Sequence, residues 1–154
     1  MDLRLPLLFA ALLWLAMPAT VLGEDGSGAD APRTGDAVVD ARLADVAVYA
    51  ARYPDAFVDE LVRYFDAPRP LIEDLLEKQG RGPGDLYYAC ALARVSGRPC
   101  RGVLEARAAA PDEAWEDIAR TLGVQPGDAR ARRLREGIAE SYARWGRPLP
   151  DATD

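Results

Sequence analysis

Four pairs of glycine and proline divide the second half of this 154-residue chain into short segments. In each pair the proline follows the glycine by two or three residues: Gly80 and Pro83, Gly97 and Pro99, Gly123 and Pro126, and Gly146 and Pro148. Glycine adopts the left-handed conformation that closes many helices, and proline cannot continue a helix because it lacks a backbone N–H. The four pairs therefore predict four helix ends.

Apolar residues along the rest of the chain, from Asp36 onward, recur at the helical spacing of three and four residues. One such stripe, which Pro54 ends, consists of Val39, Leu43, Val46 and Ala50. No segment shows the alternation of a strand followed by a hairpin turn. The pattern predicts an all-α fold, a compact array of about seven short helices arranged as orthogonal αα-hairpins. Residues 36–147 form a single helical domain in this interpretation, because so short a chain supports one core.

The first 23 residues have the order of a cleaved signal peptide. An apolar run of eleven residues, Leu7 to Met17, is followed by Pro18 and by small residues before Glu24. The run is shorter than the roughly 20 residues of a membrane span, which favours cleavage after Gly23 over an uncleaved anchor. The expected organisation is a signal peptide at 1–23, a disordered leader at 24–35, the domain, and a disordered tail at 148–154. The protein is expected in the periplasm or secreted, without a stable membrane anchor after cleavage.

Residue composition excludes several classes of site. The chain has no histidine, so serine and cysteine hydrolases with an imidazole base are excluded, as are histidine-ligated zinc, haem and copper. Its two cysteines cannot form a four-thiolate metal site. We therefore expect no cofactor and no bound metal.

Cys90 and Cys100 are the only thiols and would meet an oxidising compartment after export. Cys90 lies about two turns before Gly97, whereas Cys100 lies in the first turn of the next helix. Bridging them requires the two helices to cross rather than lie antiparallel. A disulfide and a pair of buried free thiols both remain open.

Residues 115–134 resemble a helix-turn-helix, closest to the DNA-reading module of bacterial sigma factors. The second helix would begin at Asp128, as its N-cap, and would carry a possible basic contact face made of Arg130, Arg132, Arg133 and Arg135. The alternative is the apolar inner face of a tight helical hairpin. Export favours the hairpin, because it removes the chain from DNA, and no nucleic-acid partner is expected.

Acidic and aromatic residues give two further expectations. Carboxylates are plentiful, so a carboxylate-dependent hydrolase of envelope polymers stays open. A buried acid facing a second acid across a cleft would favour it, whereas Glu73 and Glu77 have the setting of a solvated helix face. Tyr87 and Tyr88 point about 100° apart on a helix, which predicts one buried ring and one partly exposed ring.

The segment from about Pro54 to Gly127 resembles a group of small exported α-helical proteins of Gram-negative bacteria that has no assigned function. The motif W-x-x-I-A-x-x-L-G-V-x-P-G, residues 115–127, carries most of the likeness, together with Gly84-Asp85-Leu86-Tyr87-Tyr88-Ala89. The resemblance implies an exported helical fold and supplies no site residues. The leading hypothesis is a non-enzymatic interaction or accessory module that binds another protein of the cell envelope.

Overall fold

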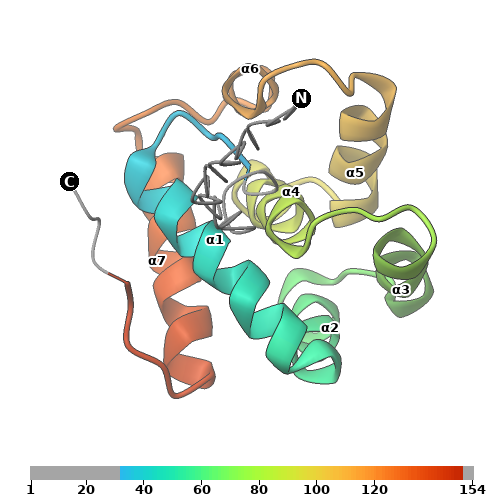
Figure 1. Cartoon of the computed structure of the whole chain (residues 1–154). Coiled ribbons are helices and arrows are strands. Elements are labelled where there is room, and N and C mark those ends of the chain that lie inside the picture. The colour runs from blue at the N-terminus through green and yellow to red at the C-terminus, as the bar shows by residue number, and fades with distance from the viewer. Residues whose placement is uncertain (1–31, 151–154) are drawn as a thin grey trace, which may run out of the picture.

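The computed structural model describes residues 32–150 and contains seven α-helices and no strand in that range (Figure 1). Their bounds are α1 Ala37–Arg52, α2 Pro54–Phe65, α3 Arg69–Glu77, α4 Pro83–Ser96, α5 Cys100–Ala109, α6 Trp115–Thr121 and α7 Ala129–Arg144. The predicted all-α array of about seven helices is confirmed. The predicted signal peptide lies outside the described residues.

Helix α4 is the centre of the fold. It packs against α1, α2, α5 and α7, and Figure 1 shows these helices around it. Nine of its 14 residues are buried, which is typical of a helix surrounded on all sides. Tyr87 is fully buried and Tyr88 is 4% exposed, so the prediction of one partly exposed ring is wrong. The reason is that both sides are covered, since Tyr87 packs against Phe65 of α2 and Tyr88 packs against Trp115 of α6.

The glycines of the four glycine–proline pairs end helices or follow them closely. Gly80, Gly97, Gly123 and Gly146 all have φ between +59° and +74°. Gly97 shows the consequence most clearly, because its left-handed backbone lets the N–H of Arg98 bond the carbonyl of Ala93 at 2.9 Å. The four predicted helix ends are confirmed.

Two aspartates cap helices through their side chains. Asp36 Oδ1 accepts from the N–H of Val38 at 3.1 Å, and Asp128 Oδ1 accepts from that of Ala131 at 2.6 Å. Hydrogen bonds from the backbone N–H groups of Ala131 and Gln125 lower the pKa of Asp128 below its ordinary value. Aspartate is therefore the start signal for the two 16-residue helices, α1 and α7.

A disulfide joins Cys90 in α4 to Cys100 at the start of α5, with their Cα atoms 4.5 Å apart. The start of α5 therefore lies against the middle of α4, and Figure 1 shows the two helices steeply inclined to one another instead of antiparallel. Of the two open alternatives, the disulfide is the one found, and the described chain has no free cysteine. The bond ties two helices that already share the core.

The inner ends of the predicted disordered segments need correction. Residues 32–35 of the leader are described, and there Thr34 is 5% exposed and bonds Asp40 Oδ1 through its N–H at 2.8 Å and its hydroxyl at 2.6 Å. In the predicted tail, Leu149 packs against the core. Tertiary contacts thus extend the domain beyond 36–147 at both ends, to residues that carry no helical periodicity.

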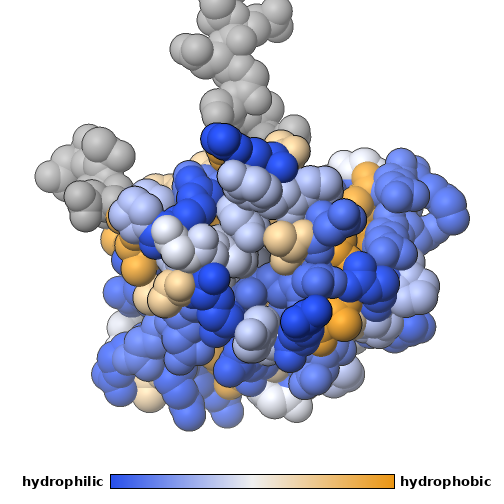
Figure 2. Space-filling model, turned by 90° about the horizontal axis from the view of Figure 1, so that it is seen from below, coloured by the Kyte–Doolittle hydropathy of each residue, from blue (hydrophilic) through white to orange (hydrophobic). Residues whose placement is uncertain are grey.

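The described helices do not include one long and apolar enough to cross a membrane. Figure 2 shows a face of the molecule that is mostly hydrophilic, with hydrophobic side chains confined to narrow patches. Most of the large apolar side chains of the described helices belong to one core. Several hollows lie on the surface of the described residues, and they include one between α4 and α7 and one where α1, α2 and α7 meet.

Candidate functional site

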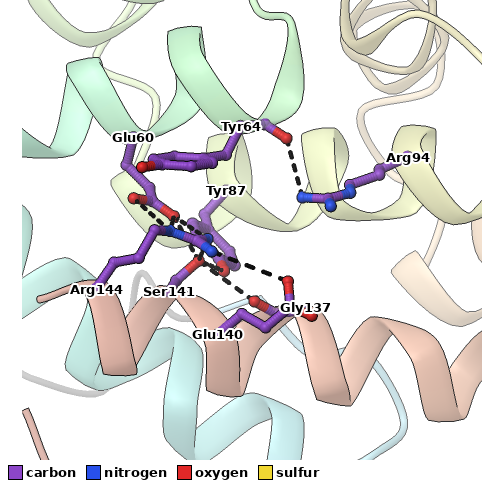
Figure 3. A network of polar contacts seen from close by, with 8 residues as sticks. All are labelled: Glu60, Tyr64, Tyr87, Arg94, Gly137, Glu140, Ser141 and Arg144. Carbon is purple, nitrogen blue, oxygen red and sulfur yellow. Dashed lines mark hydrogen bonds and ion pairs between the residues drawn. The ribbon is translucent and has the colours of Figure 1, made fainter.

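A buried polar network lies between α2, α4 and α7 (Figure 3). At its centre Glu60 is only 4% exposed, the one charged side chain that is buried within residues 32–150. Arg144 Nε donates to Glu60 Oε1 at 3.1 Å, and Ser141 Oγ donates to the same oxygen at 2.7 Å. The Tyr87 hydroxyl completes the chain by donating to Ser141 Oγ at 2.7 Å. Three helices therefore meet through one carboxylate.

The local sequences place these groups inside because they lie on apolar helix faces. Glu60 sits between the buried residues Phe57 and Leu61 of α2, and Ser141 lies between Ile138 and Tyr142 of α7. A buried carboxylate is tolerated only when it is paired and hydrogen-bonded. Arg144 supplies the positive charge that pairs with Glu60. Glu60 can therefore occupy a buried position that an apolar residue would normally take.

Two tyrosines flank the network. The guanidinium of Arg144 lies 3.9 Å from the centre of the Tyr64 ring, a cation–π contact that covers the ion pair. Burial raises the pKa of Tyr87, which keeps its hydroxyl neutral and able to donate to Ser141. The polar atoms of Glu60, Ser141 and Tyr87 thus all have partners within the protein.

This arrangement suits structure better than catalysis. Ser141 is fully buried, so a substrate cannot reach its hydroxyl. Glu60 faces a cation and two hydroxyl-bearing side chains instead of a second acid. A general acid or nucleophile would need an open path to the reacting atom. The network fixes α2, α4 and α7 relative to one another, and so shapes the surface beside it.

That surface is a groove of about 300 Å³ between α4 and α7, which we call the α4–α7 groove. It is lined by Phe65, Ala91, Arg94, Val95, Arg133, Leu134, Glu136, Gly137 and Glu140. Three of these residues, Arg94, Gly137 and Glu140, are drawn beside the network in Figure 3. The groove therefore begins where the closed polar network ends.

Gly137 is the unusual residue of this groove. It lies in the middle of α7, where glycine is less stable than alanine by roughly 0.5–1 kcal/mol. A Cβ atom placed on it would meet nothing within 4 Å, and its φ is not positive. Packing and backbone conformation in the described chain therefore give no reason for glycine here. The open space above it allows another molecule to approach the helix backbone closely.

Charges of both signs surround the groove. Arg94 Nη1 donates to the carbonyl of Tyr64 at 3.0 Å, which holds the side chain at the rim. Arg133 is exposed and has no ion-pair partner among the described residues. Glu136 is also exposed, and Glu140 lies 3.9 Å from Arg144. The rim thus offers two guanidinium groups and two carboxylates around an apolar floor.

The structure does not bring the four arginines of the possible basic face together. Arg130 Nη1 donates to the carbonyl of Gly123 at 3.0 Å, and Arg135 Nε lies 3.2 Å from Asp36 Oδ2. Arg133 lines the α4–α7 groove, whereas Arg132 is exposed outside it. Two of the four are therefore engaged within the fold, and one belongs to a rim of mixed charge.

Asp85 lies in the first turn of α4, a common place for a capping acid, but it does not cap this helix. The N-cap of α4 is Gly82, and no side chain caps this end. Asp85 accepts a 2.7 Å hydrogen bond from the indole N–H of Trp115. Trp115, 3% exposed, is thereby anchored across the fold, and the ring of Tyr88 packs edge-on against it at 5.1 Å. The tryptophan of the W-x-x-I-A motif is thus a core residue with a satisfied N–H.

Comparison with models of protein families, with curated proteins and with solved structures gives no match. The resemblance to small exported proteins stays a prediction. Within the described residues, no group of three or more cysteine and acidic side chains could hold a metal ion. Function is therefore inferred from the groove, the network and the disulfide.

Proposed function

We propose that this protein is an exported, non-enzymatic interaction module of the cell envelope, and that it holds a segment of another envelope protein in the α4–α7 groove. The observation that carries the proposal is the open space over Gly137. A glycine that the domain itself does not need, at the floor of a groove, suits a partner that contacts the helix backbone.

The chemistry of the groove favours a polypeptide partner. Its floor is apolar, from Phe65, Ala91 and Val95, and its rim has equal numbers of basic and acidic groups. An amphipathic helix with one apolar stripe and charges of both signs along its edges complements such a surface. A polyanion such as a nucleic acid would meet Glu136 and Glu140 as well as the arginines, so the mixed rim disfavours it.

Two features support export. The signal-like order of residues 1–23 predicts passage across the inner membrane. The Cys90–Cys100 disulfide is consistent with an oxidising compartment such as the periplasm. Export in turn argues against the helix-turn-helix alternative, because an exported chain does not meet DNA.

The acids of the described structure give little support to the hydrolase alternative. Glu60 is buried but neutralised by Arg144, while Glu136 and Glu140 are exposed and lie one turn apart on the same helix. A two-carboxylate mechanism needs acids on opposite sides of the scissile bond, with one in an environment that keeps it protonated. No pair among these residues has that setting.

Two neighbouring arginines provide a matched test of the groove. A photoreactive amino acid at Arg133, which lines the groove, should crosslink to an envelope protein in living cells, whereas the same probe at Arg132 should not. Gly137→Leu should fill the groove and abolish the Arg133 adduct. Adducts of equal yield at both positions, or an Arg133 adduct that survives Gly137→Leu, would contradict the proposal.

Export has its own test. Residues 1–35 fused to a reporter active only outside the cytoplasm should give processed, active reporter. Protein recovered from the periplasm should contain the Cys90–Cys100 disulfide and no thiol reactive after unfolding. A reporter that stays inside the cell, or two reactive thiols in the recovered protein, would contradict export.

A further inference from the structure

A second hollow lies on another part of the surface, where the ends of α1 and α7 meet the start of α2. It has a volume of about 460 Å³, and we call it the aromatic cleft. The side chains that give it its chemistry are Val48, Tyr49, Arg52, Tyr53, Trp145 and Arg147. Arginine supplies every charge in its lining, and none of its described lining residues is acidic. The cleft therefore differs from the α4–α7 groove, whose rim is balanced.

The cleft also contains apolar groups that the fold leaves in water. The large hydrophobic residues exposed within residues 32–150 are Val48 at 54%, Tyr53 at 47% and Tyr64 at 44%. Two of the three thus line this one cleft. The described lining of the cleft thus exposes tyrosine and arginine but no lysine and no acid. The residues that contribute most of the binding energy in protein interfaces have this composition.

The side chains at the floor of the cleft are packed against one another. The rings of Tyr49 and Trp145 stack with centres 4.1 Å apart and planes 16° apart, and Tyr53 packs against Tyr49 at 5.3 Å. Arg147 is fixed by Asp45, 2.8 Å from its Nη2, and lies 5.6 Å from the centre of the Tyr49 ring. A partner would order few side chains on binding, which lowers the entropic cost.

One cation of the cleft is available to a ligand. Arg52 is exposed and lies 5.5 Å from the centre of the Tyr53 ring, with no acid within ion-pair distance in the described part of the chain. Arginine binds carboxylates through two parallel hydrogen bonds, and an aromatic neighbour holds the guanidinium plane in place. Arg52 and Tyr53 thus present a carboxylate site directly beside an apolar surface.

From this juxtaposition we infer that the aromatic cleft binds a peptide segment that carries a carboxylate next to a large apolar side chain. Arg52 pairs with the carboxylate, and Tyr53 and Val48 cover the apolar side chain. An acidic carbohydrate fits less well, because sugar rings stack on an open aromatic face, whereas the guanidinium of Arg52 lies over the exposed ring of Tyr53. Tyr49 is only 7% exposed, and its ring faces that of Trp145.

The test uses the oxidised protein and two synthetic peptides, acetyl-Gly-Gly-Asp-Leu-Gly-Gly-amide and the same peptide with asparagine in place of aspartate. Calorimetry should show that the aspartate peptide binds about tenfold more tightly, the effect of one charge-assisted pair. Arg52→Gln and Tyr53→Ala should each weaken binding of the aspartate peptide, and added salt should weaken it further. Fluorescence of Trp145 should change with the same midpoint, and Trp145→Phe should remove that change.

Arg132→Gln is the matched control, because Arg132 is equally an exposed arginine but lies outside the cleft. It should bind the aspartate peptide as the original protein does, and circular dichroism should show all variants folded. Equal binding of the two peptides, or unchanged binding after Arg52→Gln, would overturn the inference. So would preferential binding of polygalacturonate, or self-association that Tyr53→Ala abolishes. Gly137→Leu should leave peptide binding unchanged, which separates this site from the α4–α7 groove.

Discussion

Two adjoining sides of α7, an inner face turned to the core and an outer face turned to the α4–α7 groove, use polar residues in opposite ways. On the inner face Ser141 and Tyr142 are fully buried, and each hydroxyl bonds to a carboxylate, that of Glu60 or of Asp45, at 2.7 Å. On the outer face Arg133 is exposed, without a described ion-pair partner, beside the bare backbone of Gly137. One helix thus presents a closed polar surface to the domain and an open one to its surroundings.

This difference separates stability from binding. A buried polar group without a partner costs free energy, so every polar atom of the inner face is expected to matter for folding. An exposed group contributes little to folding, so its conformation is free to serve a ligand. Inner-face variants should therefore change the free energy of unfolding, and outer-face variants should change binding.

The largest effect is expected at the buried ion pair. Arg144→Met removes the cation that neutralises Glu60 and should lower the free energy of unfolding by about 3–5 kcal/mol, the typical cost of leaving a buried charge unpaired. Urea denaturation measures this loss. Arg63→Met is the control, because Arg63 pairs with Asp59 at an exposed site and should lose less than about 1 kcal/mol.

A double variant distinguishes the charge from the volume of Arg144. In Glu60→Gln with Arg144→Met the buried site is neutral, and most of the lost stability should return. If the double variant is no more stable than Arg144→Met alone, the contribution of Arg144 is packing against Tyr64, and the inner face is not held together by charge.

Part of the fold was predictable because its signals are local. The four glycines near helix ends and the cap at Asp128 act within one turn of the backbone, so their sequence neighbours suffice. Asp85 illustrates the limit. It has the sequence setting of a cap, but Trp115, 30 residues away, takes its carboxylate. A local sequence pattern contains no information about a tertiary partner that lies so far away along the chain.

The second largest effect on the free energy of unfolding is expected at the disulfide, which belongs to the part of the molecule that stabilises the fold. Reducing Cys90–Cys100 releases a loop with a sequence separation of 10 residues and should lower stability by about 2–3 kcal/mol. The helices should stay folded, because α4 and α5 share the core without the bond. Thermal melting with and without reductant measures the change. Loss of helical structure at room temperature upon reduction would show that the framework depends on the bond.

The next effect is that the free energy of unfolding should fall at alkaline pH, because two buried tyrosines ionise. Burial raises the pKa of Tyr87, and burial with the hydrogen bond to Asp45 raises that of Tyr142. The unfolded chain therefore ionises first. The contribution of these two tyrosines to the free energy of unfolding should be constant below about pH 10 and then fall by up to about 1.4 kcal/mol per pH unit for each tyrosine. Urea denaturation over this range, together with tyrosinate absorbance, tests it. Ionisation of both rings in a chain that is still folded would contradict their burial.

The candidate site was less predictable than the fold. Glu60 is an acid within an apolar stripe of α2, and Gly137 is a glycine among residues of α7 that favour helix. Each has an ordinary explanation when only the sequence is known. An acid in a stripe can lie at its edge, and a helical glycine can pack against a neighbouring helix. The three-dimensional surroundings decide these cases, since they show that Glu60 is enclosed and that the space above Gly137 is open.

The smallest effect on stability is also the sharpest test of the comparison. Gly137→Ala adds a methyl group in open space and removes a flexible residue from the middle of a helix, so it should raise the free energy of unfolding by roughly 0.5–1 kcal/mol. The same methyl group enters the α4–α7 groove and should lower the yield of the Arg133 adduct.

Gly102→Ala is the control, because its Cβ would make only an ordinary 3.6 Å contact with Pro99 and Gly102 does not line the groove. That variant should fold normally and keep the full yield. A more stable protein that captures less of its partner would show that Gly137 is retained for binding at a cost in stability. If Gly137→Ala is more stable and captures as much as before, the outer face of α7 is not the binding surface.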